Sequence, residues 1–419
     1  MRSAILNTFI TRMMAAMLNF ASIILLSKFL GAEGKGITAR FLTIISLIQI
    51  ICDFMGGAAM VYLSSRYRLK SLILPAWCWS ALVSLSSVML FFLIDRKEFD
   101  LYGFHLASIG FMCATLYHHI HLLSGREHFK KSNQLLFLQA VLTFIFLLIG
   151  LRINVSVQTY YYALYVGYGI PWILSILFLL NIKDQIQPTG IRKASREMVY
   201  FGMANQLGHF IRFATQRLVY FILPAYAIGV YSNAMSLSES LLLISGSIST
   251  VQFGMISNSK NHESAVELTN IFLRVSLLVT FIASLILWAF PGSFYAWLFG
   301  PEFLELKNIL PLQLPGTVML SGYLIIGHYF SGLGQFKINN ISLFAGLLVT
   351  IILLSVLYWS DAGKISGEQA AAINFAANFS IFIVSIFLFL SFSKQRINKL
   401  IFQKNDLQLF ISQIKKLIA

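Results

Sequence analysis

The chain has 419 residues, of which 58% are hydrophobic and only 11% are charged. Soluble domains carry about 25% charged residues, so this composition excludes a soluble globular protein and favours an integral membrane protein. The formal net charge is +15. Because the basic residues lie between long apolar stretches, this charge indicates a membrane-facing role, and no nucleic-acid partner is expected.

Twelve stretches of the sequence are long and apolar enough to be transmembrane helices, since a helix needs about 20 apolar residues to cross a bilayer. The predicted spans lie near residues 8–30, 37–64, 72–94, 101–123, 133–151, 159–181, 199–223, 225–256, 269–290, 309–332, 341–359 and 370–393. The expected fold is an all-α integral membrane protein of about twelve transmembrane helices. Its expected parts are an N-terminal six-helix lobe (1–181), a cytoplasmic linker (182–198), a C-terminal six-helix lobe (199–393) and a basic amphipathic cytoplasmic tail (394–419).

The distribution of Lys and Arg over the loops predicts the orientation of the chain. The side that holds the N-terminus, the linker and the tail carries nineteen of them, and the opposite side carries eight. The richer side is predicted to be cytoplasmic. The first loop is an exception, because it places Lys28, Lys35 and Arg40 on the outer side. The prediction is a multi-pass protein with both termini in the cytoplasm.

An internal repeat indicates that the two halves are related. Residues 124–133 (SGREHFKKSN) and 331–340 (SGLGQFKINN) match at an offset of 207, and His121 and His328 match just upstream. Both segments lie between the fourth and fifth span of a half. Six helices per half make the halves parallel, with a pseudo-twofold axis along the membrane normal. We therefore expect two pseudo-symmetric six-helix lobes around a central cavity.

Polar side chains inside the predicted spans are the candidate substrate site, because a charge in hydrocarbon costs about 2.5–3.5 kcal/mol and usually faces a cavity. In the seventh span, four of them are spaced by four, three and four residues and share one helical face. They are Asn205, His209, Arg212 and Gln216, with Arg217 just off this face. In the first span, Arg12 and Asn19 also share a face.

The two polar faces are expected to correspond. Aligning residues 30–36 with 223–229, at an offset of 193, pairs Arg12 with Asn205 and Asn19 with Arg212. Both faces would then line a cavity between the lobes with cations and amides. The alternative for Arg12 is that it extends to the cytoplasmic interface, and the alternative for Arg212 is a buried ion pair.

The acidic residues inside the spans are fewer. Asp53 and Glu239 lie in the second and eighth spans. They are expected to pair with the arginines, to carry a coupling ion, or to hold helices together by hydrogen bonds. No catalytic residue and no metal site are expected. The cluster of His118, His119 and His121 does not place three ligands on one helical face.

The end of the chain has the pattern of an amphipathic helix. From residue 399 onward, apolar residues recur on one side with basic and amide residues opposite. Such a helix suits the surface of the inner leaflet.

Three turns of the sequence carry a family resemblance. Residues 28–36 (KFLGAEGKG) are similar to the basic-x-Leu-Gly-x-x-x-x-Gly turn that follows the first helix of bacterial polysaccharide exporters. Residues 298–303 (LFGPEF) and 332–340 (GLGQFKINN) are similar to their loops after helices nine and ten. The chain thus resembles the O-antigen (lipid-linked oligosaccharide) flippase branch of the multidrug/oligosaccharidyl-lipid/polysaccharide exporter superfamily. It departs from the family at Lys28, where the turn usually has Arg.

This resemblance implies a flippase, and not an enzyme, in the bacterial inner membrane. Its substrate would be an undecaprenyl-diphosphate-linked oligosaccharide of lipopolysaccharide biosynthesis, moved from the cytoplasmic to the periplasmic leaflet by alternating access. A proton or sodium gradient would drive it without a cofactor, and membrane lipids and other polysaccharide-assembly proteins would be further partners. Guanidinium groups suit a diphosphate because they stay charged and bind phosphate oxygens in pairs.

Two other functions remain open from the sequence. A multidrug antiporter of the same fold should favour acidic residues in its cavity. A membrane polysaccharide polymerase should have a large outer loop, whereas the largest outer loop here, 291–308, is short.

Overall fold

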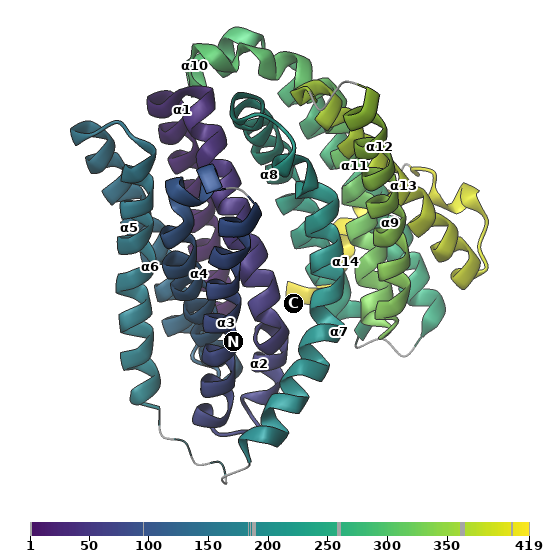
Figure 1. Cartoon of the computed structure of the whole chain (residues 1–419). Coiled ribbons are helices and arrows are strands. Elements are labelled where there is room, and N and C mark those ends of the chain that lie inside the picture. Colours follow the sequence, from purple (N-terminus) through teal and green to yellow (C-terminus); the bar gives the residue numbers. More distant parts are fainter. Residues whose placement is uncertain are drawn as a thin grey trace. The chain divides into compact units, whose positions relative to one another are not determined.

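The computed structural model describes residues 2–94, 96–182, 184, 186, 190–257, 261–360, 365–403 and 405–418. Over these ranges the regular secondary structure is helical, without a strand (Figure 1). The predicted all-α membrane fold class is therefore confirmed. Part of the predicted linker, at residues 183, 185 and 187–189, lies outside the described residues.

The chain divides into two compact units, Met1–Phe210 and Ile211–Ala419. Unit 1 contains α1 (Arg2–Cys52), η1 (Asp53–Met55), α2 (Gly57–Leu63), α3 (Leu69–Ile94), α4 (Arg96–Gly125), α5 (Phe129–Ile153), α6 (Val157–Leu180) and the first part of α7 (Ile191–Arg217). Unit 2 contains the end of α7, η2 (Leu218–Phe221), α8 (Ala225–Ser257), α9 (His262–Ala289), α10 (Gly292–Phe299), η3 (Pro301–Glu305), α11 (Leu306–Gly332), α12 (Phe336–Ser360), α13 (Gly367–Ser393), η4 (Ile397–Leu400) and α14 (Asp406–Ile418).

The division between the units falls inside α7, and close packing explains why the start of this helix belongs to unit 1. A Cβ placed on Gly202 would lie 2.1 Å from the carbonyl oxygen of Phe54. A Cβ on Gly57 would lie 2.6 Å from Nε2 of Gln206. The glycines thus allow α7 to approach the segment around η1 closely. The two predicted lobes and the cavity at their centre stay predictions.

Within the described residues, ten helical segments are long and apolar enough to cross a membrane. The first of them, Ile10–Leu63, has 54 residues, which is too long for one crossing, and it contains a break at Gly31 with φ 67°. It therefore holds two of the predicted spans. The seventh predicted span is not among the ten, because α7 carries arginines, histidine and amides along its length. Its assignment as a crossing stays a prediction.

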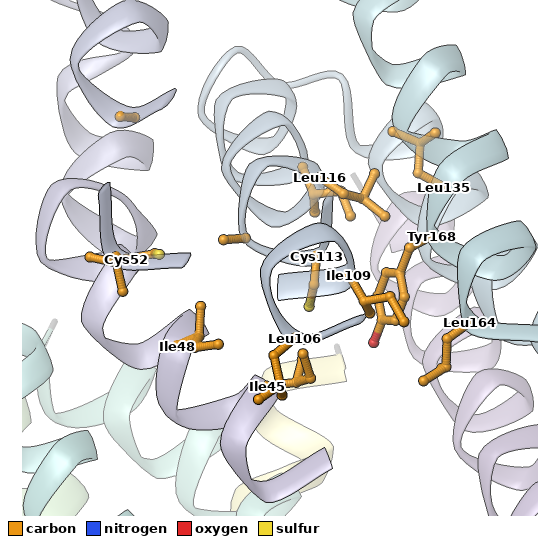
Figure 2. Close-up of a cluster of buried hydrophobic side chains, with 14 of the residues drawn as sticks. Ile45, Ile48, Cys52, Leu106, Ile109, Cys113, Leu116, Leu135, Leu164 and Tyr168 are labelled. Atoms are coloured by element: carbon orange, nitrogen blue, oxygen red, sulfur yellow. The ribbon is translucent and has the colours of Figure 1, made fainter. Parts of the chain in front are cut away.

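Buried apolar side chains hold each unit together. In unit 1, α4 supplies Leu106, Ile109, Cys113 and Leu116 to a cluster that faces residues of α1, α5 and α6 (Figure 2). In unit 2, α11 packs against α8, α9 and α13, and this explains why most of its residues are buried. Such packing is the main force between helices where lipid removes the hydrophobic drive for association.

The three turns that carry the family resemblance each contain a glycine in a conformation that side chains rarely adopt. Gly31, Gly300 and Gly334 have φ of 67°, 118° and 74°. Without a Cβ, glycine reaches positive φ at little cost, so each motif marks a place where one helix must end abruptly. The backbone conformation therefore explains why these motifs contain glycine at these positions.

The internal repeat has the same geometry in both units. His128 N donates to Leu123 O at 2.8 Å, and 207 residues later Gln335 N donates to Phe330 O at 2.8 Å. Glu127, with φ 62°, stands where the second copy has Gly334. A side-chain bond is also repeated, with Ser124 Oγ to Ser132 Oγ at 2.8 Å matched by Asn339 Nδ2 to Ser331 Oγ at 2.9 Å. The sequence repeat is thus a repeat of one helix–turn–helix structure.

The C-terminal segment is built into unit 2. Arg274 of α9 is 6% exposed, and its Nη2 donates to Oδ1 of the fully buried Asp406 of α14 at 2.6 Å. Phe272 and Phe410 pack edge to face between the same two helices. The sequence predicts a helix on the membrane surface, and the structure adds an anchor to α9 that the amphipathic pattern did not reveal.

Candidate functional site

A buried acid–imidazole pair lies at the break between α1 and α2. Asp53 begins η1, and its Oδ1 is 3.5 Å from Nε2 of His118 in α4. Asp53 is 8% exposed and His118 is 1% exposed. In the described part of the chain, neither Asp53 Oδ1 nor either ring nitrogen of His118 has a hydrogen-bond partner. Such unsatisfied buried polar atoms are uncommon and ask for an explanation.

Glycine makes this pair possible. Gly56 ends η1, and a Cβ on it would lie 2.2 Å from His118 Nε2. Gly57 follows with φ 53°. The two glycines therefore break the helix and let the imidazole approach the backbone beside the carboxylate. Two titratable groups held together away from water can share or exchange one proton, so this pair is a candidate for ion coupling.

The three clustered histidines have different surroundings. His118 faces Asp53, whereas Nε2 of His119 accepts from Trp77 Nε1 at 3.0 Å. His121 interacts electrostatically with Asp53, His118 and Arg12. His118 and His119 therefore have different nearest partners, although all three histidines lie in one electrostatic neighbourhood.

A second ionic group lies in unit 2. Nη2 of Arg217 donates to both carboxylate oxygens of Glu239 at 2.8 Å, and its Nη1 donates to the hydroxyl of Tyr220 at 2.6 Å. The guanidinium also lies over the Tyr220 ring, 5.1 Å from its centroid. Of the roles left open for Glu239, the structure places it in an ion pair. Arg217 is occupied by this pair and is therefore a weaker candidate for substrate binding.

Gln216 belongs to a buried network of amides in unit 2. Its Nε2 donates to Asn378 Oδ1 and its Oε1 accepts from Asn374 Nδ2, both at 2.8 Å. Asn378 donates in turn to Asn374, and Gln313 donates to Asn374 at 3.0 Å. Gln216 is 7% exposed. The interpretation of Gln216 as a cavity-lining residue therefore needs correction, because both ends of its amide are used inside the helix bundle.

Two of the exposed candidates are arginines on α1 and α7. Arg12 of α1 and Arg212 of α7 are exposed, and neither forms an ion pair with a described carboxylate. Each interacts electrostatically with a histidine of its own unit, Arg12 with His121 and Arg212 with His328. These two histidines match in the internal repeat. The predicted correspondence of Arg12 with Asn205 stays a prediction.

The remaining predicted site residues are Asn19, His209 and Asn205. Asn19 and His209 are exposed on α1 and α7, on the same helices as the two arginines. Asn205 lies in α7, but its side chain is outside the described residues. Sequence reasoning missed His118 as the neighbour of Asp53, and it missed Asn374 and Asn378. Asn374 and Asn378 are four residues apart inside an apolar span, so they share one helical face. This spacing could have indicated a polar contact inside the bundle.

Comparison with known proteins identifies the fold. No family model matches the sequence, and no curated protein matches it. Among solved structures, the chain is similar to an inward-facing multidrug resistance MATE family transporter of the MOP superfamily, with a TM-score of 0.71 and 14% identity over 95% of this chain and 98% of that one. It is also similar to the lipid II flippase MurJ in an inward closed conformation, with a TM-score of 0.67 and 17% identity over 99% and 96%.

A third similar structure is a MOP superfamily transporter from Pyrococcus furiosus, described as having a binding pocket of reverse polarity, with a TM-score of 0.61 and 15% identity over 94% and 96% of the two chains. The chain therefore has the fold of MOP-superfamily transporters. The polysaccharide-exporter branch stays a prediction.

Proposed function

We propose that the protein is a flippase that moves an undecaprenyl-diphosphate-linked oligosaccharide from the cytoplasmic to the periplasmic leaflet by alternating access. The fold supports a transporter, and a flippase of a lipid-linked substrate is among the proteins that share it. The observation that carries the proposal is the balance of charges. Arg12 and Arg212 are exposed, whereas Asp53 is buried beside His118 and Glu239 is paired with Arg217.

The predicted depth of Arg212 in the membrane supports its role in substrate binding. Arg212 lies 13 residues after the predicted start of the seventh span at residue 199, which is about 20 Å along a helix axis. An arginine at this depth cannot face lipid without a cost of several kcal/mol, so it is expected to face water or substrate. A guanidinium that no carboxylate of the described residues neutralises is suited to a diphosphate and unsuited to a cationic drug.

The test is transport of the defined lipid by purified protein in proteoliposomes. Each charge-assisted hydrogen bond to phosphate contributes about 1.5–3 kcal/mol, so Arg212→Ala is expected to lower flipping at least roughly tenfold. Arg212→Lys keeps the charge but loses the bidentate geometry, and it should retain part of the activity.

Arg152, an exposed residue at the end of α5, provides a matched control. Arg152→Ala removes the same charge elsewhere on the protein and should leave flipping unchanged. Wild-type flipping by Arg212→Ala, at equal protein content, would remove Arg212 from the substrate site.

A multidrug antiporter is the second candidate, because multidrug transporters share the fold. It would need an acidic group free to receive a cation. The same proteoliposomes separate the two functions. Accumulation of a fluorescent cationic dye that depends on Glu239, together with no flipping of the lipid, would favour the antiporter.

We further propose that the protein lies in the bacterial inner membrane with both termini in the cytoplasm, and that Asp53 and His118 carry a coupling proton. The positive-inside distribution supports the orientation. Reporter fusions after residue 188 and after Glu302 should report opposite compartments, and identical signals would refute the topology. The coupling proposal rests on the buried polar atoms of the pair that have no hydrogen-bond partner among the described residues.

A further inference from the structure

A cavity of about 410 Å³ lies in unit 1, between the start of α3 and the end of α6. Its lining includes Arg68 just before α3, Lys70 in the first turn of α3, and Trp77 two turns further along. Trp77 follows the first residue of α3 by eight positions, so the cavity extends about 12 Å along this helix. Ligand sites in proteins commonly have volumes of about 300–1,000 Å³, so the size is adequate for a ligand.

The inner part of the cavity has apolar walls and polar groups that are already bonded to one another. Ile73 and Ile176 form part of the wall. Trp77 Nε1 donates to His119 Nε2 at 3.0 Å, and His119 Nδ1 lies 2.6 Å from Ser175 Oγ. Since the tryptophan donates to Nε2, the proton of a neutral His119 is on Nδ1, directed at the serine. This inner part therefore offers apolar surface to a ligand and suits a hydrocarbon chain better than a sugar or a phosphate.

The mouth of the cavity is basic. Arg68 and Lys70 are both exposed. Asp184 also lines the cavity, but its carboxylate accepts from Arg126 Nη2 at 3.1 Å and from the backbone N–H of Leu69 at 2.6 Å. Arg126 therefore neutralises the acid, and the two cations of the mouth remain in excess. Arg68 is held in place by its Nε, which donates to the carbonyl of Ile186 at 2.6 Å.

We propose that this cavity binds one anionic phospholipid, with its phosphate at Arg68 and Lys70 and the upper part of one acyl chain against Trp77. A basic mouth above an apolar interior matches the order of groups in such a lipid, and the mouth lies beside the predicted cytoplasmic ends of α3 and α6, where headgroups lie. The proposal is independent of the transported substrate, because none of its residues belongs to the proposed substrate site.

The test uses phosphatidylglycerol and phosphatidylcholine with identical brominated chains, since bromine quenches a tryptophan that it touches. The full-length protein is reconstituted with increasing mole fractions of each lipid, and the contribution of Trp77 is taken as the difference between wild type and Trp77→Phe. Quenching of Trp77 is expected to reach half of its maximum at a lower fraction of phosphatidylglycerol than of phosphatidylcholine. Lys70→Gln should reduce this preference roughly fivefold, because a basic residue near a membrane contributes about 1 kcal/mol to the attraction of an anionic lipid.

Lys130 is exposed at the start of α5, on the same predicted side of the membrane and outside the cavity lining. Lys130→Gln is therefore the matched control and should keep the wild-type preference. Equal quenching by the two lipids, or an unchanged preference in Lys70→Gln, would show ordinary contact with bulk lipid and overturn the proposal. Loss of quenching on addition of millimolar glycerol phosphate would indicate a site for a soluble phosphate instead.

A second measurement keeps the proposal testable where Trp77→Phe does not fold. Native mass spectrometry is applied to wild type, Lys70→Gln and Lys130→Gln after release from mixed phosphatidylglycerol and phosphatidylcholine. Wild type and Lys130→Gln should retain phosphatidylglycerol, whereas Lys70→Gln should lose it. Equal retention by all three would overturn the site.

Discussion

Arg274 and Asp406 form an ion pair inside unit 2 that ties the C-terminal helix to α9. The side chains are 6% and 0% exposed, and the two nearest atoms are 2.6 Å apart. Arg274 Nη1 also donates to Lys399 O at 2.6 Å, and Asp406 Oδ2 accepts from Gln403 N at 2.6 Å. The arginine thus holds the segment before α14 as well as α14 itself.

Removal of one partner leaves the other charge buried without compensation. Breaking a buried pair in this way costs about 3–5 kcal/mol in proteins, which corresponds to roughly two to four orders of magnitude in an equilibrium constant. We therefore expect Asp406→Ala or Arg274→Met to shift α14 strongly toward an undocked state. The double variant Arg274→Met/Asp406→Leu removes both charges and fills similar volume, so it should recover most of the loss.

Hydrogen–deuterium exchange measures this state directly, because amide protection reports local opening free energies. In the single variants, protection of the α14 amides at 406–413 should fall by at least about a hundredfold. Protection of α5 should not change, since α5 belongs to the other unit. Glu263→Ala removes an exposed acid at the start of α9 and serves as the matched control, with an expected effect within about 0.5 kcal/mol.

Two results would refute this reasoning. Wild-type protection of α14 in both single variants would show that the pair does not anchor the tail. A double variant as weakly protected as the singles would show that volume and packing, rather than the uncompensated charge, explain the effect. The pair also changes the expectation for a truncated protein, because deletion of 401–419 removes Asp406. We expect such a truncation to lower the amount of folded protein.

Asp53→Asn removes the carboxylate of the buried pair at nearly constant size, and lipid flipping in proteoliposomes should then lose its response to an imposed pH gradient. His118→Gln should have the same effect, and an undiminished response in both would exclude the pair from coupling. At the repeated turn, Gly334→Ala should lower the free energy of unfolding by about 1–2 kcal/mol, because the new residue must keep a φ of 74°. Glu127→Gly, at φ 62°, should raise the free energy of unfolding by a similar amount. Thermal unfolding in detergent measures both, and shifts of the same sign would contradict the backbone explanation.

The sequence alone determined the features that depend on local patterns. The apolar stretches predicted the membrane-spanning helices, because hydrocarbon accepts only segments that satisfy their own backbone groups. The turn motifs predicted where helices end, since Gly31, Gly300 and Gly334 occupy positive φ. The ten-residue repeat predicted equivalent turns, and the matched hydrogen bonds follow from the same local residues.

Only the tertiary structure determined which polar side chains contact one another, because these contacts join helices that are far apart in the chain. Helical periodicity placed Gln216 on one face with Arg212, but α13 covers Gln216 with two asparagines and leaves Arg212 exposed. The same holds for Asp53, whose partner His118 comes from α4, and for Arg274, whose partner lies 132 residues later. A period of 3.6 residues fixes the direction of a side chain around its own helix, and only packing determines what it faces.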